Sequence, residues 1–351
     1  MMDPALPPLS LRVLHGDAER RLRQDADAMI RRLLAPHPRA LSLYDHIRED
    51  PPLKALWDLT SFLAVGRYDR NDHGDIHAHI VAANAMHLFR LLVGHGVQPE
   101  AVRCGAGTLE DAAVVVLLGA MLHDLGNLVS HEGHAAHGVA LAQPLLTRLL
   151  PLVYGEDEVK KAIVGSLVLS AIATHECAPA PVTLEGGIVA VADAADMTSG
   201  RTQSHEDDTT VGLSRAYPRV VTAVHIEPGR FSPAHIRVEI QSPIGVRRVE
   251  ELVGRRLFLS GLDRHVTMQV FPAFEAQAGG PQSYSLKQGR LRPDGIDQQP
   301  EGVQPIDPVC SAVVPHDRVA TQTVYDGVRV AFCSERCLAV FMSNPTKYPT
   351  H

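Results

Sequence analysis

An adjacent histidine and aspartate, His123 and Asp124, stand at the end of an unbroken apolar run that begins at Ala112. The run is too short for a membrane span, and its length suits a buried helix that Gly126 then ends. Burying an imidazole and a carboxylate is costly unless each has a partner, and a metal ion satisfies both. The alternative is a helix C-terminus whose polar end faces water, which is the better interpretation of an isolated His-Asp pair.

Further histidines and an aspartate at helical positions favour the metal. His77 begins a helical stripe that continues through Val81 and Leu88, so its side chain can point toward the core. Asp193 closes a second buried apolar run, which starts at Gly187. Together with His123 and Asp124, these residues give a nitrogen and oxygen ligand set without thiolates. Such a set suits Mn²⁺, Fe²⁺, Mg²⁺ or Zn²⁺.

Two more histidines are candidate ligands of a second ion. His134 lies on a helical face after the central stretch, and His175 ends a predicted helix over 158–174. If both bind metal, Asp124 can bridge two ions, which would clamp the attacking and the leaving oxygen of an in-line displacement. The alternative is that both histidines hydrogen-bond to the ligands of a single ion.

His77, His123-Asp124 and Asp193 resemble, in order and context, the H…HD…D signature of the HD-domain phosphohydrolases. The stretch from Asn71 to His77, Asn-Asp-His-Gly-Asp-Ile-His, also resembles the start of a subgroup common in archaea and some bacteria. The resemblance covers residues 66 to 205. It implies a helical bundle, a divalent metal with His123 and Asp124 as catalytic residues, and hydrolysis of a nucleotide, cyclic nucleotide or other phosphoester.

The chain departs from the family pattern at two positions. Asn127 stands where a phosphate-binding lysine often follows the HD motif, and it becomes a candidate substrate contact instead. The paired histidines of the dinuclear cyclic-dinucleotide branch are reduced to Thr174-His175. Hydrolysis of cyclic dinucleotides is therefore disfavoured.

Three other polar residues have two interpretations each. Asp72 and His73 precede the first ligand, where they either contact substrate and orient His77 or form a capped helix start. Arg201 follows the last ligand, where it either binds phosphate as a catalytic residue or forms a surface ion pair.

A second possible metal site lies near the C-terminus. Cys310, Cys333 and Cys337 fall in a stretch that resembles the YHS domain, whose Tyr-x-Gly turn matches Tyr325-Asp-Gly. Three thiolates suit Zn²⁺ or Cu(I), and a set of reduced structural cysteines is the alternative.

The composition restricts the class of protein. The chain has 351 residues, 19 histidines, a net charge of -7 and a pI near 6.2, which argues against a nucleic-acid-binding surface. We expect no signal peptide and no stretch of about 20 apolar residues, and hence a cytoplasmic protein. A homodimer formed through the strands after residue 220 is compatible with the sequence.

The predicted fold is mainly α, an HD-type helical bundle with a small α+β appendage and a small cysteine-containing module. The predicted parts are a helical cover (1–65), the HD core (66–205), the appendage (206–273), a flexible linker (274–304) and the YHS-like module (305–351). The predicted function is metal-dependent hydrolysis of a small phosphorylated substrate. The alternatives are a di-iron oxygenase on the same scaffold and a regulatory protein that senses nucleotide or metal without turnover.

Overall fold

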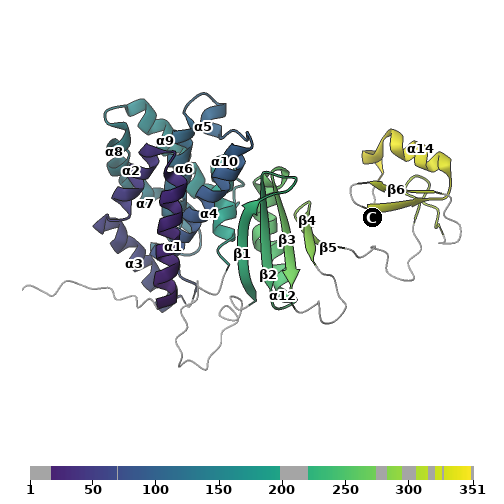
Figure 1. The fold of residues 1–351 in the computed structure, drawn as a ribbon, viewed down its shortest axis with the longest axis horizontal. Coiled ribbons are helices and arrows are strands. Elements are labelled where there is room, and N and C mark those ends of the chain that lie inside the picture. Colours follow the sequence, from purple (N-terminus) through teal and green to yellow (C-terminus); the bar gives the residue numbers. More distant parts are fainter. Residues whose placement is uncertain are drawn as a thin grey trace, which may run out of the picture. The chain divides into compact units, whose positions relative to one another are not determined.

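The computed structural model divides the chain into two compact units, Met1–Asp294 and Gly295–His351 (Figure 1). The described residues are 17–68, 70–197, 220–273, 283–294, 306–314, 321–325 and 328–348. The predicted fold class is confirmed, since a helical bundle carries a small mixed sheet and a separate cysteine-containing module follows.

The helical bundle fills the first two thirds of the first unit (Figure 1). Its elements are α1 (Asp17–Leu34), α2 (Pro38–Ile47), α3 (Pro51–Gly66), α4 (Asp75–Gly94), α5 (Glu100–Arg103), α6 (Leu109–Leu122), η1 (Leu125–Leu128), α7 (His134–Leu149), α8 (Pro151–Tyr154), α9 (Glu158–Thr174) and α10 (Leu184–Ala194). The helices begin where the sequence supplies caps. Asp50 accepts from the Leu53 amide at α3, and Thr108 and Asp111 form a reciprocal capping box at α6.

Three helices lie at the centre of the bundle. Every residue of α6 from Asp111 to Leu122 is buried, and α10 is buried from Glu185 to Ala194. Within the described part of the chain, one helix, α4, is long and apolar enough to cross a membrane by length and composition alone. However, 72% of its apolar window is buried inside the bundle, and it packs on α1, α6 and α10. It is therefore the core helix that brings His77 inward.

Two glycines allow the close packing around the central histidines. A Cβ at Gly126 would lie 1.8 Å from the carbonyl oxygen of His134, so only glycine lets η1 approach α7. A Cβ at Gly74 would lie 2.6 Å from the carbonyl oxygen of Trp57 on α3. The turns that enter α4 and leave α6 are thus held tightly against neighbouring helices.

The α+β appendage begins at Val221 and shares one continuous core with the bundle. Its strands are β1 (Val221–Pro228), β2 (Ala234–Ile240), β3 (Val266–Pro272), β4 (Tyr284–Lys287) and β5 (Arg290–Pro293), paired in that order. Only β2 and β3 are parallel, and the connection between them is helical: α12 (Ile244–Val249), η4 (Glu250–Gly254), α13 (Arg255–Leu259) and η5 (Leu262–Arg264). Alternating burial along β2 puts one face of the sheet on the core.

The predicted linker over 274–304 is wrong for residues 284–293. These residues form β4 and β5, and β4 pairs with β3 through Gln269–Ser285 and Val270–Tyr284. The Glu250 carboxylate also accepts from the Leu291 amide at 2.7 Å, which fixes the hairpin to the helical connection. The polar composition of this stretch hid two short strands. The boundaries at 65 and 205 stay predictions, since they fall inside one compact unit.

The second unit has a small core of its own. A hairpin of β6 (Thr321–Tyr325) and β7 (Val328–Phe332) packs on α14 (Glu335–Ser343), which is followed by η8 (Pro345–Lys347). Phe332 and Phe341 are buried with their ring centroids 5.3 Å apart. This core positions Cys333 directly after β7, Cys337 in α14 and Cys310 in the loop before β6.

Candidate metal centre

Two imidazole rings face each other at the centre of the bundle. The Nε2 atom of His77, on α4, lies 3.2 Å from the Nε2 atom of His123, at the end of α6. The Oδ1 atom of Asp193, on α10, is 3.2 Å from the first nitrogen and 3.6 Å from the second. The Oδ2 atom of Asp124 is 3.2 Å and 3.4 Å from the same two nitrogens. The four ligands predicted from sequence therefore converge on one point.

A second pair of histidines faces the other oxygen of Asp124. The Nε2 atoms of His134 and His175 are 3.0 Å apart. They lie 3.3 Å and 3.8 Å from Asp124 Oδ1. Asp124 is thus placed between two histidine pairs with one oxygen toward each, as expected of a carboxylate that bridges two ions.

The hydrogen bonds of the four rings fit metal binding. His123, His134 and His175 direct Nδ1 toward the carbonyl oxygens of Ala120, His131 and Ile172 at 2.7–2.9 Å. His77 directs Nδ1 toward a carboxylate oxygen of Asp196 at 2.6 Å. Since these oxygens only accept, each Nδ1 carries the hydrogen and each Nε2 presents a lone pair. Two lone pairs at about 3 Å repel unless a cation or a proton lies between them.

The charges of the buried groups at the centre also favour a bound cation. Burial raises the pKa of Asp124, but His123, His73 and His134 outweigh it and hold that pKa well below its usual range. Burial lowers the pKa of His123, but Asp124 and Asp193 outweigh it and raise that pKa to about 9. In the metal-free protein, His123 therefore takes up a proton to offset the buried carboxylates. A divalent cation would displace that proton.

Three polar residues surround Asp124 on the side of the α4 entry loop and η1. His73 directs Nδ1 at Asp124 Oδ2 at 2.6 Å, so it is both a candidate ligand and a hydrogen-bond donor to the bridge. Asn127 donates to Asp124 Oδ1 at 3.0 Å, and its own oxygen lies 2.9 Å from Nδ1 of His131. The predicted substrate-contact roles of His73 and Asn127 stay predictions.

The remaining predicted site residues have different outcomes. Asp72 accepts from Ser61 Oγ at 2.5 Å and from the Gly74 amide at 2.9 Å, so it shapes the loop that enters α4. Asp72 does not cap α4, whose N-cap residue is Gly74, and its predicted contact with substrate stays a prediction. Arg201 lies outside the described residues.

Sequence reasoning did not assign a role to three residues that the fold brings to the centre: Asp196, His131 and Arg256. Asp196 was visible as a carboxylate at the end of the second apolar run. His131 stacks on His134 with the ring planes at 14°. Arg256 comes from α13 of the appendage and donates from Nη1 to Asp193 Oδ2. No local pattern could have connected Arg256 to a ligand 63 residues earlier.

The comparisons with known proteins agree with this geometry. Residues 76–198 match the model of the HD domain, and residues 305–351 match that of the YHS domain. The uncharacterized protein MJ1020 of Methanocaldococcus jannaschii is 31% identical over 226 residues, which are 64% of this chain and 86% of that protein. The chain belongs to the HD-domain family. This is a family of metal-dependent hydrolases. No solved structure matches the chain.

The YHS domain of the second unit holds a separate candidate metal site. The Sγ atom of Cys333 lies 3.5 Å from that of Cys310 and 3.8 Å from that of Cys337. Asp307, which sequence reasoning did not assign as a ligand, completes the cluster and accepts from the Cys333 amide at 2.9 Å. Asp307 and Cys310 raise the pKa of the Cys333 thiol to about 12. The Cys333 thiol therefore keeps its proton until a thiophilic cation displaces it.

Proposed function

We propose that the HD domain hydrolyses a small phosphorylated substrate, such as a nucleotide, a cyclic nucleotide or a similar phosphoester, in the cytoplasm. The observation that carries this proposal is the position of Asp124 between two lone-pair-bearing histidine pairs. His77, His123, Asp124 and Asp193 would hold one ion, and His134, His175 and Asp124 a second. Manganese, iron, magnesium and zinc all suit this set of nitrogen and oxygen ligands.

A divalent ion bound there supplies the polarisation of a phosphoryl oxygen and a lowered pKa of bound water. The protein's own groups do the positioning. Asp196 orients His77 from behind, and Asn127 connects the backbone and carboxylate of Asp124 to His131. These contacts fix the ligand atoms before substrate arrives.

The groups proposed to meet the substrate phosphate are His73, Asn127 and Arg201. His131 lies beside His73 and Asn127, with its ring centroid 6.2 Å from that of His73 and its Nδ1 2.9 Å from Asn127 Oδ1. Burial, Arg70 and His134 lower the pKa of His131 to about 4, so it is neutral at pH 7. It can therefore offer the substrate a hydrogen bond but not a charge.

The test is a screen of the purified full chain, loaded with each metal, against nucleotides, cyclic nucleotides and generic phosphodiesters. Asp124→Ala should abolish turnover and the binding of both ions. Glu132→Ala removes an exposed carboxylate from the neighbouring turn and should change neither turnover nor metal binding. Binding of a nucleotide without turnover would assign a regulatory protein instead. Oxygen consumption by the iron-loaded protein would assign an oxygenase.

A further inference from the structure

The metal centre is not built from the helical bundle alone. Arg256, on α13 of the α+β appendage, directs Nη1 at the Oδ2 atom of Asp193 at 2.5 Å. The same nitrogen lies 3.3 Å from the carbonyl oxygen of Ala190, one turn earlier on α10. The guanidinium thus contacts both the backbone and the carboxylate of the helix that supplies the late ligand.

The two oxygens of Asp193 have different partners. Oδ1 faces the Nε2 atoms of His77 and His123, while Oδ2 faces Arg256. A carboxylate held at one oxygen cannot rotate freely, so the contact with Arg256 determines that Oδ1 points at the histidines. Groups that orient metal ligands in this way typically change metal affinity or activity 10- to 100-fold when they are removed.

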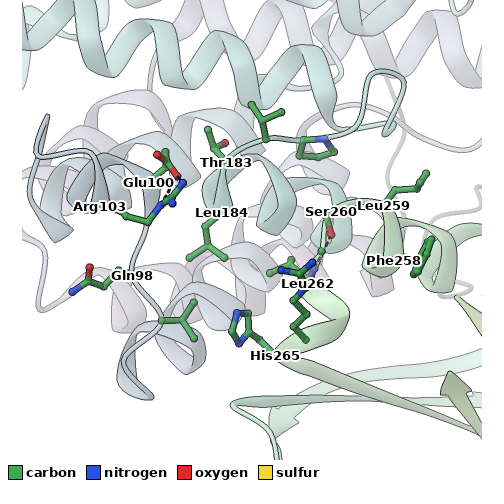
Figure 2. A pocket seen from close by; sticks show the side chains of 15 residues that line it. Gln98, Glu100, Arg103, Thr183, Leu184, Phe258, Leu259, Ser260, Leu262 and His265 are labelled. Atoms are coloured by element: carbon green, nitrogen blue, oxygen red, sulfur yellow. Dashed lines mark hydrogen bonds and ion pairs between the residues drawn. The ribbon is translucent and has the colours of Figure 1, made fainter. Parts of the chain in front are cut away.

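The packing between α10 and the appendage keeps Arg256 in place. A Cβ at Gly187 would lie 3.1 Å from Ser260 Cβ, so the glycine allows α10 to approach the end of α13 closely. Leu257, the next residue after Arg256, is fully buried. Figure 2 shows Leu184 of α10 on one side and Ser260 and Leu262 of the appendage on the other, lining a pocket of about 470 Å³. The start of α10 and the segment after Arg256 therefore share one interface.

Arginine is suited to this position for a geometric reason. The two hydrogens of Nη1 lie in the plane of a rigid guanidinium and reach the Asp193 carboxylate and the Ala190 carbonyl together, whereas a lysine ammonium is a single point charge on a flexible stem. The Arg256 side chain is only 14% exposed, so its contact with Asp193 is shielded from solvent.

We propose that Arg256 is a positioning residue of the metal centre, through which the α+β appendage holds Asp193 in its metal-binding orientation. The appendage is then part of the catalytic unit. This inference rests on the metal centre of the proposed function.

The experiment measures Mn²⁺ binding to the full chain by calorimetry and by electron paramagnetic resonance. Arg256→Ala should weaken the binding of one ion by about 10- to 100-fold. Arg256→Lys keeps the charge but not the planar guanidinium, and its Mn²⁺ affinity should fall between those of the native protein and the alanine variant. Arg255→Ala is the matched control, because it removes a neighbouring exposed charge from the same helix. It should bind Mn²⁺ as the native protein does.

Circular dichroism melting shows whether each variant is folded. If Arg256→Ala does not fold, the Mn²⁺ affinity of Arg256→Lys tests the proposal in its place. Native or tighter Mn²⁺ binding by folded Arg256→Ala would overturn the proposal, since Arg256 would then only repel the cation. An equal loss in Arg255→Ala would also overturn it, because the effect would come from charge and not from the contact. Failure of the native chain to bind Mn²⁺ would refute the metal centre itself, which is a distinct result.

Discussion

The carboxylate of Asp196 holds the ring of His77 from behind, with Oδ2 2.6 Å from Nδ1. Both side chains are buried, and the opposite ring nitrogen faces His123 at 3.2 Å. A carboxylate in this position fixes the ring orientation and strengthens the basicity of the metal-facing nitrogen. Asp196 therefore belongs to the centre although it is not one of its ligands.

Asp196→Ala should weaken metal binding by about 10- to 100-fold, because the His77 ring loses its orienting acceptor. Asp196→Asn should lose less metal affinity than Asp196→Ala, since an amide oxygen still accepts from His77 Nδ1, although it carries no charge. Metal titration of the two variants checks this order. Equal affinity in both variants and the native protein would show that the packing of α4 alone orients His77.

Removal of one histidine distinguishes one ion from two. His175→Ala takes away a ligand from the pair that faces Asp124 Oδ1, and the manganese or iron content measured by elemental analysis should fall from two ions per chain to one. His137→Ala is a suitable control, because it removes a histidine from α7 that lies outside the metal-binding clusters of the described residues. A single manganese or iron ion in the native protein, unchanged in His175→Ala, would place His175 among the groups that only support the site.

Much of the centre could be predicted because its ligands follow apolar runs. His123 and Asp124 end α6, and Asp193 lies near the end of α10, so burial of the runs carries the polar residues inward. The sequence also predicted strands after residue 220 and a small α+β appendage, where the structure has β1 to β3 and the helical connection between β2 and β3.

The contacts that sequence reasoning missed depend on the tertiary fold. Arg256 meets Asp193 only because the appendage packs on α10. The strands β4 and β5 are four residues each and rich in polar side chains, so no apolar alternation distinguished them from a linker. Both features that were not predicted, the contact of Arg256 and the strands β4 and β5, belong to the appendage. The contribution of the appendage to the metal centre was therefore not predicted.

Asp111 provides a test of fold stability that does not involve the metal. Its buried carboxylate accepts from the Thr108 amide at 2.8 Å, from Tyr154 at 2.9 Å and from Lys160 at 3.1 Å. Asp111→Ala should lower the free energy of unfolding by about 3–5 kcal/mol, the usual cost of breaking a buried ion pair. Glu158→Ala, which removes an exposed ion pair, should cost less than about 1 kcal/mol.

The contribution of Asp111 should depend on pH. Burial raises the pKa of Asp111, but the Thr108 amide, Lys160 and Tyr154 outweigh it, so the folded pKa lies below the usual value of 3.8. Because the pKa of Asp111 is lower in the folded than in the unfolded protein, its stabilising effect is complete at pH values above the pKa of the unfolded protein. The effect is lost as the pH falls through the pKa of the folded protein. The stability difference between native protein and Asp111→Ala should be constant above about pH 5 and shrink in acid. Chemical denaturation at several pH values measures it.

The YHS domain should bind its ion independently of the HD domain. Cys333→Ser removes the sulfur that contacts both other cysteines, so the full chain should lose one equivalent of Zn²⁺ or Cu(I) and keep its manganese or iron. Cys104→Ser replaces an exposed cysteine of the first unit and should change neither metal. Zinc content unaffected by Cys333→Ser would favour a structural role for the cysteines.

The hairpin of β4 and β5 predicts where the chain can be shortened. A chain that ends at Asp294 keeps the hairpin, and it should fold and bind the HD-domain ions as the full chain does. A chain that ends at Phe274 loses the strand that pairs with β3 and the contact between Glu250 and the Leu291 amide. It should expose a strand edge, aggregate and melt at a lower temperature.

The chain that ends at Phe274 should also bind Mn²⁺ more weakly. Because η4 leads directly into α13, Arg256 is less constrained in that chain. Equal melting temperature and Mn²⁺ affinity in the two shortened chains would contradict this role of the hairpin.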